Sequence, residues 1–127
     1  IEKKKIKKIN NNYSIYNEIF DLTRQAKNVL NSNKYNSINE FGHLLNEYWD
    51  LKKSLDVSVS NDKINFYQKQ FLNNGAYGSK LMGAGSSGFI LILSDNTVRK
   101  KLIKKFPTLN FIKVNGENNG SELIYST

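Results

Sequence analysis

Apolar residues between positions 14 and 55 repeat at helical spacing in two successive segments. In the first segment the repeating positions are Ile15, Ile19, Leu22, Ala26, Val29 and Leu30. Spacings of three and four place them on one face of an amphipathic helix, which we expect to end near Asn31. Asn36 or Ser37 is suited to cap a second helix that runs to about Leu55. The pattern therefore predicts two long helices that each bury one face.

The apolar face of the second predicted helix includes one lysine. The arc consists of Ile38, Phe41, Leu44, Leu45, Tyr48, Leu51 and Leu55, with Trp49 at its edge. Lys52 falls in the middle of this arc, so its ammonium must extend to the rim of the core or meet an anion. His43, the only histidine, lies on the opposite polar face, and we expect it at the surface.

Two shorter helices are predicted further along the chain. One begins at Ser60 or Asn61 and ends at Gly75, which suits the left-handed conformation after a last helical turn. The other begins at Asp95 or Asn96 and ends before Pro107. Their inward-facing residues are expected to be Ile64, Tyr67 and Phe71 in the first, and Val98, Leu102 and Phe106 in the second.

Strand character lies on both sides of the fourth predicted helix. Residues 75–93 contain two segments of strand character around a loop of Gly, Ala and Ser, and Phe89–Leu93 is a continuous apolar run typical of a covered strand. Phe111–Val114 and Leu123–Tyr125 are predicted to form a second hairpin. This order of elements predicts an α+β fold with a mostly antiparallel four-stranded sheet backed by helices.

The loop between the first two predicted strands is the main candidate for a functional site. Gly83, Gly85 and Gly88 can adopt positive φ without a steric penalty, so their amides could turn toward one anion. The same glycines could instead permit a tight hairpin or the close approach of a neighbouring loop. The loop matches neither the P-loop pattern nor the dinucleotide pattern, because no Gly-Lys-Ser/Thr follows it and a strand, not a helix, comes next.

Composition narrows the possible classes of protein. The 127 residues fit one domain, and 39% hydrophobic with 12% aromatic residues indicate a packed globule. Because the chain has no cysteine and one histidine, disulfides, thiolate catalysis and histidine-clustered metal sites are excluded. No apolar run approaches the length of a membrane span and no signal peptide is visible, so we expect a soluble, cytoplasmic protein without a membrane partner.

The net charge of +8 is compatible with nucleic acid, a membrane surface or a small anionic substrate as partner. Much of the excess lies in residues 3–8 and 99–105, and such runs are more often solvated faces than binding sites. Residues 1–12 are basic and show no clear period, so we expect a linker or tail there.

Residues 78–89, which read Gly-Ser-Lys-Leu-Met-Gly-Ala-Gly-Ser-Ser-Gly-Phe, resemble the third signature motif of the GHMP small-molecule kinases. That family is named for galactokinase, homoserine kinase, mevalonate kinase and phosphomevalonate kinase, and its motif usually reads Lys-Leu-x-Gly-Ala-Gly-Gly-Gly-Gly. The chain departs from it at Ser86 and Ser87. Residues 40–55 are similar to the helix that precedes this motif in the sugar branch. The closest resemblance is to D-glycero-D-manno-heptose 7-phosphate kinases, and it spans Tyr13 to Tyr125.

The resemblance implies a fold and a set of site residues. Residues 13–127 would form the ferredoxin-like C-terminal domain of a sugar kinase. Lys52 and Lys53 would bind the phosphate of the sugar substrate. The residues expected to support the phosphate loop or the ATP site are Lys80, Gly83, Ala84, Gly85, Ser86, Ser87 and Gly88.

In this family the main phosphate loop, Pro-x-x-x-Gly-Leu-Gly-Ser-Ser, and the acidic residue near the acceptor lie in an N-terminal domain. Neither pattern occurs here, so the resemblance implies no catalytic residue and no metal ligand in this chain. ATP and Mg²⁺ would be bound mainly by an N-terminal domain in cis, and the chain alone would be inactive. The whole enzyme would phosphorylate the anomeric hydroxyl of a heptose 7-phosphate for surface polysaccharide synthesis.

Two other function classes remain open at this point. The chain could be a stand-alone module that binds a small anion or regulates another protein without catalysis. It could also bind nucleic acid through its basic segments and aromatic residues on the strands. The second alternative is disfavoured, because Phe89, Phe111 and Tyr125 lie in apolar runs or alternations that a core would also need.

Overall fold

The computed structural model describes residues 2–32, 36–83 and 85–116, with side chains from Asn12 onward. Its elements in chain order are α1 (Glu2–Asn31), α2 (Ser37–Leu55), the short 3-10 helix η1 (Val57–Val59), α3 (Asp62–Asn73), β1 (Gly78–Leu81), β2 (Ile90–Leu93) and α4 (Asn96–Lys105). The predicted helices and the hairpin through the glycine loop are all present, so the α+β class is confirmed.

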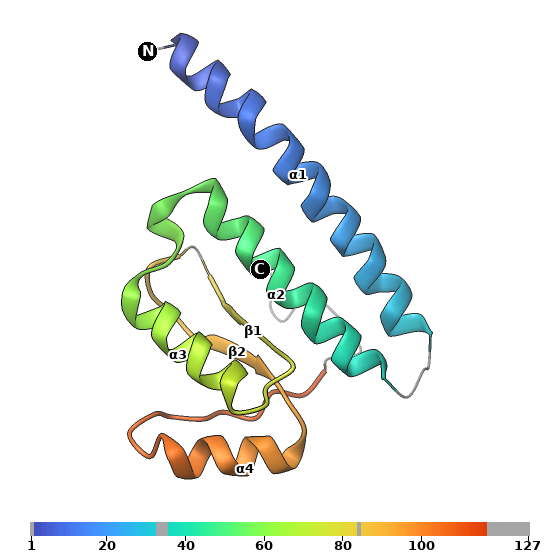
Figure 1. The fold of residues 1–127 in the computed structure, drawn as a ribbon, viewed down its shortest axis with the longest axis vertical. Helices are drawn as coiled ribbons and strands as arrows, with labels where there is room; N and C mark the ends of the chain where they lie inside the picture. Colours follow the sequence, from blue (N-terminus) through green and yellow to red (C-terminus); the bar gives the residue numbers. More distant parts are fainter. Residues whose placement is uncertain (1, 33–35, 84, 117–127) are drawn as a thin grey trace, which may run out of the picture.

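The helices form layers on the hairpin (Figure 1). The long helix α1 packs along α2, and α2 in turn packs on β1. Helix α3 contacts both strands, and α4 follows β2 directly. Helix α2 therefore lies between α1 and the hairpin, which places residues from opposite sides of α2 in two different environments.

The first helix is longer than the sequence pattern predicted. It begins at Glu2, whereas the apolar period predicted a start near Ser14 and a tail before it. No Gly or Pro occurs between Glu2 and Asn31, and Lys and Glu are favourable helix residues. Because helix propagation costs little once a turn has formed, the helix extends through the basic segment without needing an apolar face there.

Side-chain caps fix the start of the two shorter helices at predicted positions. The Oδ1 atom of Asn61 accepts a hydrogen bond from the Ile64 amide at 3.0 Å, which caps α3. The Oδ1 atom of Asp95 accepts from the Val98 amide at 2.7 Å, which caps α4. This bond from Val98, with a second from the Tyr77 hydroxyl, holds the pKa of Asp95 below its ordinary value.

The expected four-stranded sheet is not confirmed. In the described ranges the sheet has two antiparallel strands, with a register that runs from Gly78 opposite Leu93 to Leu81 opposite Ile90. The predicted strand Phe111–Val114 is wrong, because that segment has no strand structure. Ile112 and Val114 are exposed, and Phe111 packs on a helix instead of pairing in a sheet. The Phe111 ring contacts Phe71 of α3 with centroids 6.4 Å apart. The predicted strand 123–125 lies outside the described residues.

Buried side chains form two clusters on the hairpin. The first contains Trp49, Ile64 and Leu81, and the second contains Phe71, Ala76 and Leu102. Ile90 of β2 packs against both clusters, so the strand joins them. All of β2 is only half-buried, and Phe89, which the apolar run placed in the strand, lies before it with its side chain 71% exposed.

Candidate functional site

The glycine loop between β1 and β2 adopts the left-handed backbone that its composition predicted. φ is +102° at Gly83, +121° at Gly85 and +133° at Gly88. Residues with a Cβ atom rarely adopt these angles, so glycine is required here for conformation. Ser86 also has a positive φ, of 61°, and is the only such residue other than glycine in the described ranges.

The segment between α2 and α3 holds this loop in place. The Ser86 amide donates to the Val59 carbonyl oxygen at 3.2 Å, and the Ser86 hydroxyl donates to the Ser58 carbonyl oxygen at 2.5 Å. The side-chain amide of Asn61 donates to the Ser86 carbonyl oxygen at 2.8 Å. A Cβ atom on Gly85 would come within 3.0 Å of the Val59 Cα atom. Ser86, a departure from the family motif, therefore anchors the loop through three hydrogen bonds.

Part of the loop backbone is already engaged. The Ser87 amide donates to the Gly85 carbonyl oxygen at 2.7 Å, and the Ser86 amide is bonded to Val59. These two amides are not free to bind an anion from outside. Any phosphate contact by this loop must come from its other groups, among which Ala84 lies outside the described residues.

Two lysines from different elements lie beside the loop, because Lys52 contacts Gly83 and Lys80 contacts Tyr48, one helical turn before Lys52 on α2. Lys52 of α2 is half-buried, and its ammonium donates to the Gly83 carbonyl oxygen at 3.3 Å. Lys80 of β1 places its ammonium 4.3 Å from the centre of the Tyr48 ring, within range of a cation–π interaction. Burial, and then the positive charge of Lys52, lower the pKa of Lys80 from its ordinary value of 10.5. The two ammonium groups thus share one electrostatic environment.

Lys80 also borders a cavity between the first two helices. The cavity has a volume of about 170 Å³ and is lined by Leu22, Thr23, Ala26, Phe41, Leu44, Leu45, Tyr48 and Lys80. Apart from the Thr23 hydroxyl and the Tyr48 hydroxyl, its walls are apolar, and Lys80 is the only charged residue among them. The Thr23 hydroxyl already donates to the Ile19 carbonyl oxygen at 2.9 Å. The cavity itself offers few partners for a polar ligand.

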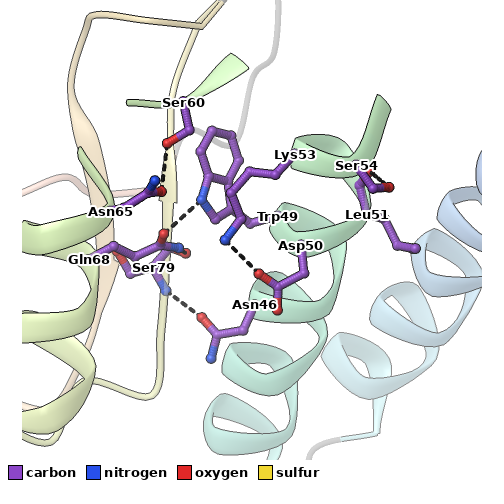
Figure 2. Close-up of polar contacts among 10 residues, drawn as sticks. All are labelled: Asn46, Trp49, Asp50, Leu51, Lys53, Ser54, Ser60, Asn65, Gln68 and Ser79. Atoms are coloured by element: carbon purple, nitrogen blue, oxygen red, sulfur yellow. Dashed lines mark hydrogen bonds and ion pairs between the residues drawn. The ribbon is translucent and has the colours of Figure 1, made fainter. Parts of the chain in front are cut away.

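Lys53 lies on the side of α2 that faces α3, away from Lys52 and Gly83. Its ammonium forms an ion pair with Asp50, with the Nζ and Oδ1 atoms 2.8 Å apart (Figure 2). Together with Asn46, Gln68 and others it lines a hollow of about 280 Å³ between α2 and α3. The structure therefore brings Lys52, Lys80 and Gly83 together, and it does not bring Lys53 to them.

A buried polar network that the sequence pattern did not predict positions the strand that carries Lys80. Figure 2 shows its members Asn46, Trp49, Gln68 and Ser79. The side-chain amide of Asn46 donates to the Tyr77 carbonyl oxygen at 3.1 Å and accepts from the Ser79 amide at 2.9 Å. The Trp49 indole donates to the Gln68 side chain at 2.7 Å, and Gln68 donates to the Ser79 carbonyl oxygen at 2.7 Å. The backbone amide of Ser79 is thus bonded to α2, and its carbonyl oxygen is bonded to α3.

The remaining candidates behave as their residue types indicate. His43 is exposed on α2, in agreement with its predicted place on the polar face. Within the described part of the chain, no group of three His, Cys, Asp or Glu side chains is arranged to hold a metal ion. In the same part, none of the helices combines the length and apolar character needed to cross a bilayer.

These features together, a helix-backed hairpin with a glycine loop and a lysine beside it, agree with the resemblance to the C-terminal part of the GHMP kinases. The family model of the GHMP kinases C terminal matches residues 22–108. The chain belongs to this family. The matched range includes α2, α3, the hairpin and α4, and so contains every site residue named above.

Two relatives are sugar kinases. The chain is 40% identical over 68 residues to the D-glycero-alpha-D-manno-heptose 7-phosphate kinase of Campylobacter jejuni, which covers 51% of this chain and 20% of that enzyme. It is 34% identical over 86 residues to the bifunctional fucokinase/GDP-fucose pyrophosphorylase of Arabidopsis thaliana, which covers 66% of this chain and 8% of that protein. The chain thus spans at most about a fifth of either relative. No solved structure matches it.

Proposed function

We propose that this chain is the C-terminal part of an ATP-dependent sugar kinase whose acceptor is a sugar phosphate. The observation that carries the proposal is the contact of Lys52 with the Gly83 carbonyl oxygen. This contact places a positive charge at the loop that characterises the family, where an anionic substrate would be recognised. The identity to a heptose 7-phosphate kinase supports the same substrate class.

The proposed reaction is phosphorylation of the anomeric hydroxyl of a heptose 7-phosphate in the cytoplasm. ATP and Mg²⁺ would be the cofactors, bound mainly by an N-terminal ATP-binding domain joined in cis. The product would serve the synthesis of nucleotide-activated heptose for surface polysaccharide. In this scheme residues 13–127 form the C-terminal domain, and residues 2–12 extend its first helix.

Positioning is the role we assign to this chain in the reaction. Phosphoryl transfer depends on the placement of substrate and phosphates and on positive charge near the transferred group. Lys52 would bind the phosphate already present on the sugar. The loop residues 83–88, anchored by Ser86 on the segment before α3, would shape the ATP side of the site.

The test is a substrate panel on the full-length protein. The expected result is ATP- and Mg²⁺-dependent phosphorylation of heptose 7-phosphate, with little turnover of fucose or unphosphorylated heptose. The 127-residue chain alone is expected to be inactive. Turnover of fucose at the same rate would contradict the proposed acceptor, and activity of the isolated chain would contradict the division between two domains. Phosphate binding without turnover by the full-length protein would favour a non-catalytic anion-binding module.

A further inference from the structure

Lys52 and Lys80 are two neighbouring cations without an acidic partner. In residues 12–32, 36–83 and 85–116, the ion pairs within 4.0 Å are those of Arg24 with Asp21 and of Lys53 with Asp50. Lys52 donates to one carbonyl oxygen, and Lys80 contacts an aromatic ring. Each ammonium carries three N–H donors, so most of this hydrogen-bonding capacity is unused by the described residues.

The proximity of two positive charges destabilises the protonated form of Lys80 unless an anion compensates them. Lys80 is partly desolvated, and the nearby charge of Lys52 further disfavours its protonated form. One anion placed between the two ammonium groups would offset both effects, because it attracts each of them. A dianion matches the charge of the pair, whereas a single carboxylate leaves one positive charge uncompensated.

We propose that Lys52 and Lys80 together bind the phosphate group of the substrate as a dianion, so that this pair selects a phosphorylated sugar over a neutral one. This inference rests on the proposed function, and it identifies Lys80 of β1, in place of Lys53, as the second phosphate ligand. A phosphate monoester presents three acceptor oxygens, which suits donors arriving from two directions. Helix α2 and strand β1 supply these two directions.

The cavity beside Lys80 indicates on which side the sugar lies. Its walls are almost entirely apolar, so sugar hydroxyls placed there would lose hydrogen bonds to water without replacement. The sugar must therefore extend from the phosphate toward the glycine loop, where Lys52 meets the Gly83 carbonyl oxygen. The apolar cavity side of the pair offers no charged group that would compete with the phosphate for the two lysines.

The ionisation of Lys80 can report whether the site is occupied. The titratable groups that face it are Tyr48 and Lys52, both from α2. The α1 residues on the cavity wall, Leu22, Thr23 and Ala26, carry no charge, and neither does Leu91, its partner on β2. A bound dianion would stabilise the protonated form, so the pKa of Lys80 must rise when phosphate binds.

The experiment is an NMR titration of the full-length protein with its lysine side chains labelled. The probes are inorganic phosphate, mannose 6-phosphate as a stable sugar monophosphate, and mannose as the neutral control. We expect both phosphates to shift the Lys52 and Lys80 signals and to raise the pKa of Lys80, and mannose to do neither. Absence of any shift at Lys80, or the same shift with mannose, would overturn the proposal.

Variants separate the pair from the neighbouring lysine. Lys52→Met and Lys80→Met should each weaken phosphate binding about tenfold, as expected for loss of one charge-assisted hydrogen bond. Lys80→Arg should keep most of the affinity, and Lys53→Met should change it less than about twofold. Each variant is first checked for an unchanged pattern of backbone amide signals. Full affinity in Lys80→Met, or equal loss in Lys53→Met, would contradict the assignment.

The binding result and the kinase assay can fail independently. Phosphate binding at the pair with turnover of fucose by the full-length protein would contradict the proposed acceptor and leave the binding site intact. Turnover restricted to heptose 7-phosphate with no phosphate contact at Lys80 would confirm the acceptor and overturn the role of the pair.

Discussion

Gly42 of α2 and Gly78 of β1 are in direct backbone contact. A Cβ atom on Gly78 would lie 2.5 Å from the carbonyl oxygen of Gly42, and one on Gly42 would lie 2.6 Å from the carbonyl carbon of Tyr77. Only a pair of glycines allows the helix to approach the strand so closely. This approach brings Lys52, further along α2, beside Lys80, two residues beyond Gly78 on β1.

The first prediction tests this contact with Gly42→Ala. Alanine is favoured over glycine within a helix by about 1 kcal/mol, so helix propensity alone would stabilise the variant. Because the added methyl group meets fixed backbone, we expect instead a net loss of about 1–3 kcal/mol in the free energy of unfolding, measured with urea. Asn39→Ala, at an exposed position on the same helix, should change it by less than about 0.5 kcal/mol. A stabilised Gly42→Ala variant would refute the close contact.

The second prediction concerns Gln68, which is buried and bonded on both sides. Gln68→Leu keeps the size of the side chain but leaves the Trp49 indole and the Ser79 carbonyl oxygen without these hydrogen bonds. Each buried group left unpaired costs about 1–3 kcal/mol, and we expect the free energy of unfolding to fall accordingly.

A control for Gln68→Leu lies in the same network. The Ser79 hydroxyl is buried and has no hydrogen-bond partner among the described residues. Ser79→Ala removes this unsatisfied group, so the free energy of unfolding should stay constant or rise slightly. Similar losses of stability in Gln68→Leu and Ser79→Ala would show that changes in packing, and not the loss of hydrogen bonds, destabilise this network.

The third prediction explains how serine is accepted at position 86. Its positive φ is unfavourable for a residue with a Cβ atom, by roughly 1 kcal/mol, and its hydroxyl bond to Ser58 offsets this cost. Ser86→Ala keeps the unfavourable backbone and loses the bond, so it should be the least stable form. Ser86→Gly loses the bond but removes the backbone cost, so it should lie close to the natural chain. Thermal unfolding of all three forms checks this order, and equal stability of the Ala and Gly variants would contradict it.

The sequence predicted local elements well and relations between elements poorly. The caps at Asn61 and Asp95 and the positive φ of the loop glycines depend on neighbouring residues, so the pattern of the chain was sufficient for them. Lys52 was recognised because a charge in an apolar arc is a local conflict. Lys53 was grouped with it through the family resemblance, although successive residues on a helix point in directions about 100° apart.

What the sequence missed depends on contacts between distant positions. Trp49 was placed at the edge of one apolar face, but α2 is covered by α1 on one side and β1 on the other, so Trp49 is fully buried. Its network joins residues 19 and 33 positions apart, and no local period encodes such pairs. Phe111–Val114 is rich in apolar residues as a strand would be, yet Phe111 contacts α3 and no partner strand lies beside the segment in the described residues.

The fourth prediction assigns the substrate phosphate to Lys52 in the full-length enzyme. Lys52→Ala should raise the KM for heptose 7-phosphate about 10- to 100-fold, the loss expected for one charge-assisted hydrogen bond of about 1.5–3 kcal/mol. The KM for ATP should change far less, because the proposed role of Lys52 is to bind the sugar phosphate. Lys53→Ala, one residue away on the same helix, is the matched control and should have little effect on either KM. Equal effects of Lys52→Ala on both substrates would remove Lys52 from the sugar-phosphate site.

The fifth prediction follows from the ionisation of Lys80. Its pKa is lowered in the folded chain by burial and by Lys52, so the unfolded chain binds more protons between this lowered value and the ordinary value of 10.5. The free energy of unfolding must therefore rise with pH through that window. Below the window Lys80 is protonated in both states, and its unfavourable charge destabilises the folded chain by a constant amount. The difference in unfolding free energy between the natural chain and Lys80→Met should become more favourable to the natural chain as pH rises toward 10.5.

Saturating phosphate should reduce this change with pH, because a bound dianion stabilises the charged form of Lys80. Lys100→Met, at an exposed position on α4, is the control. A pH dependence of the same size in both variants would mean that neither burial nor the charge of Lys52 lowers the pKa of Lys80.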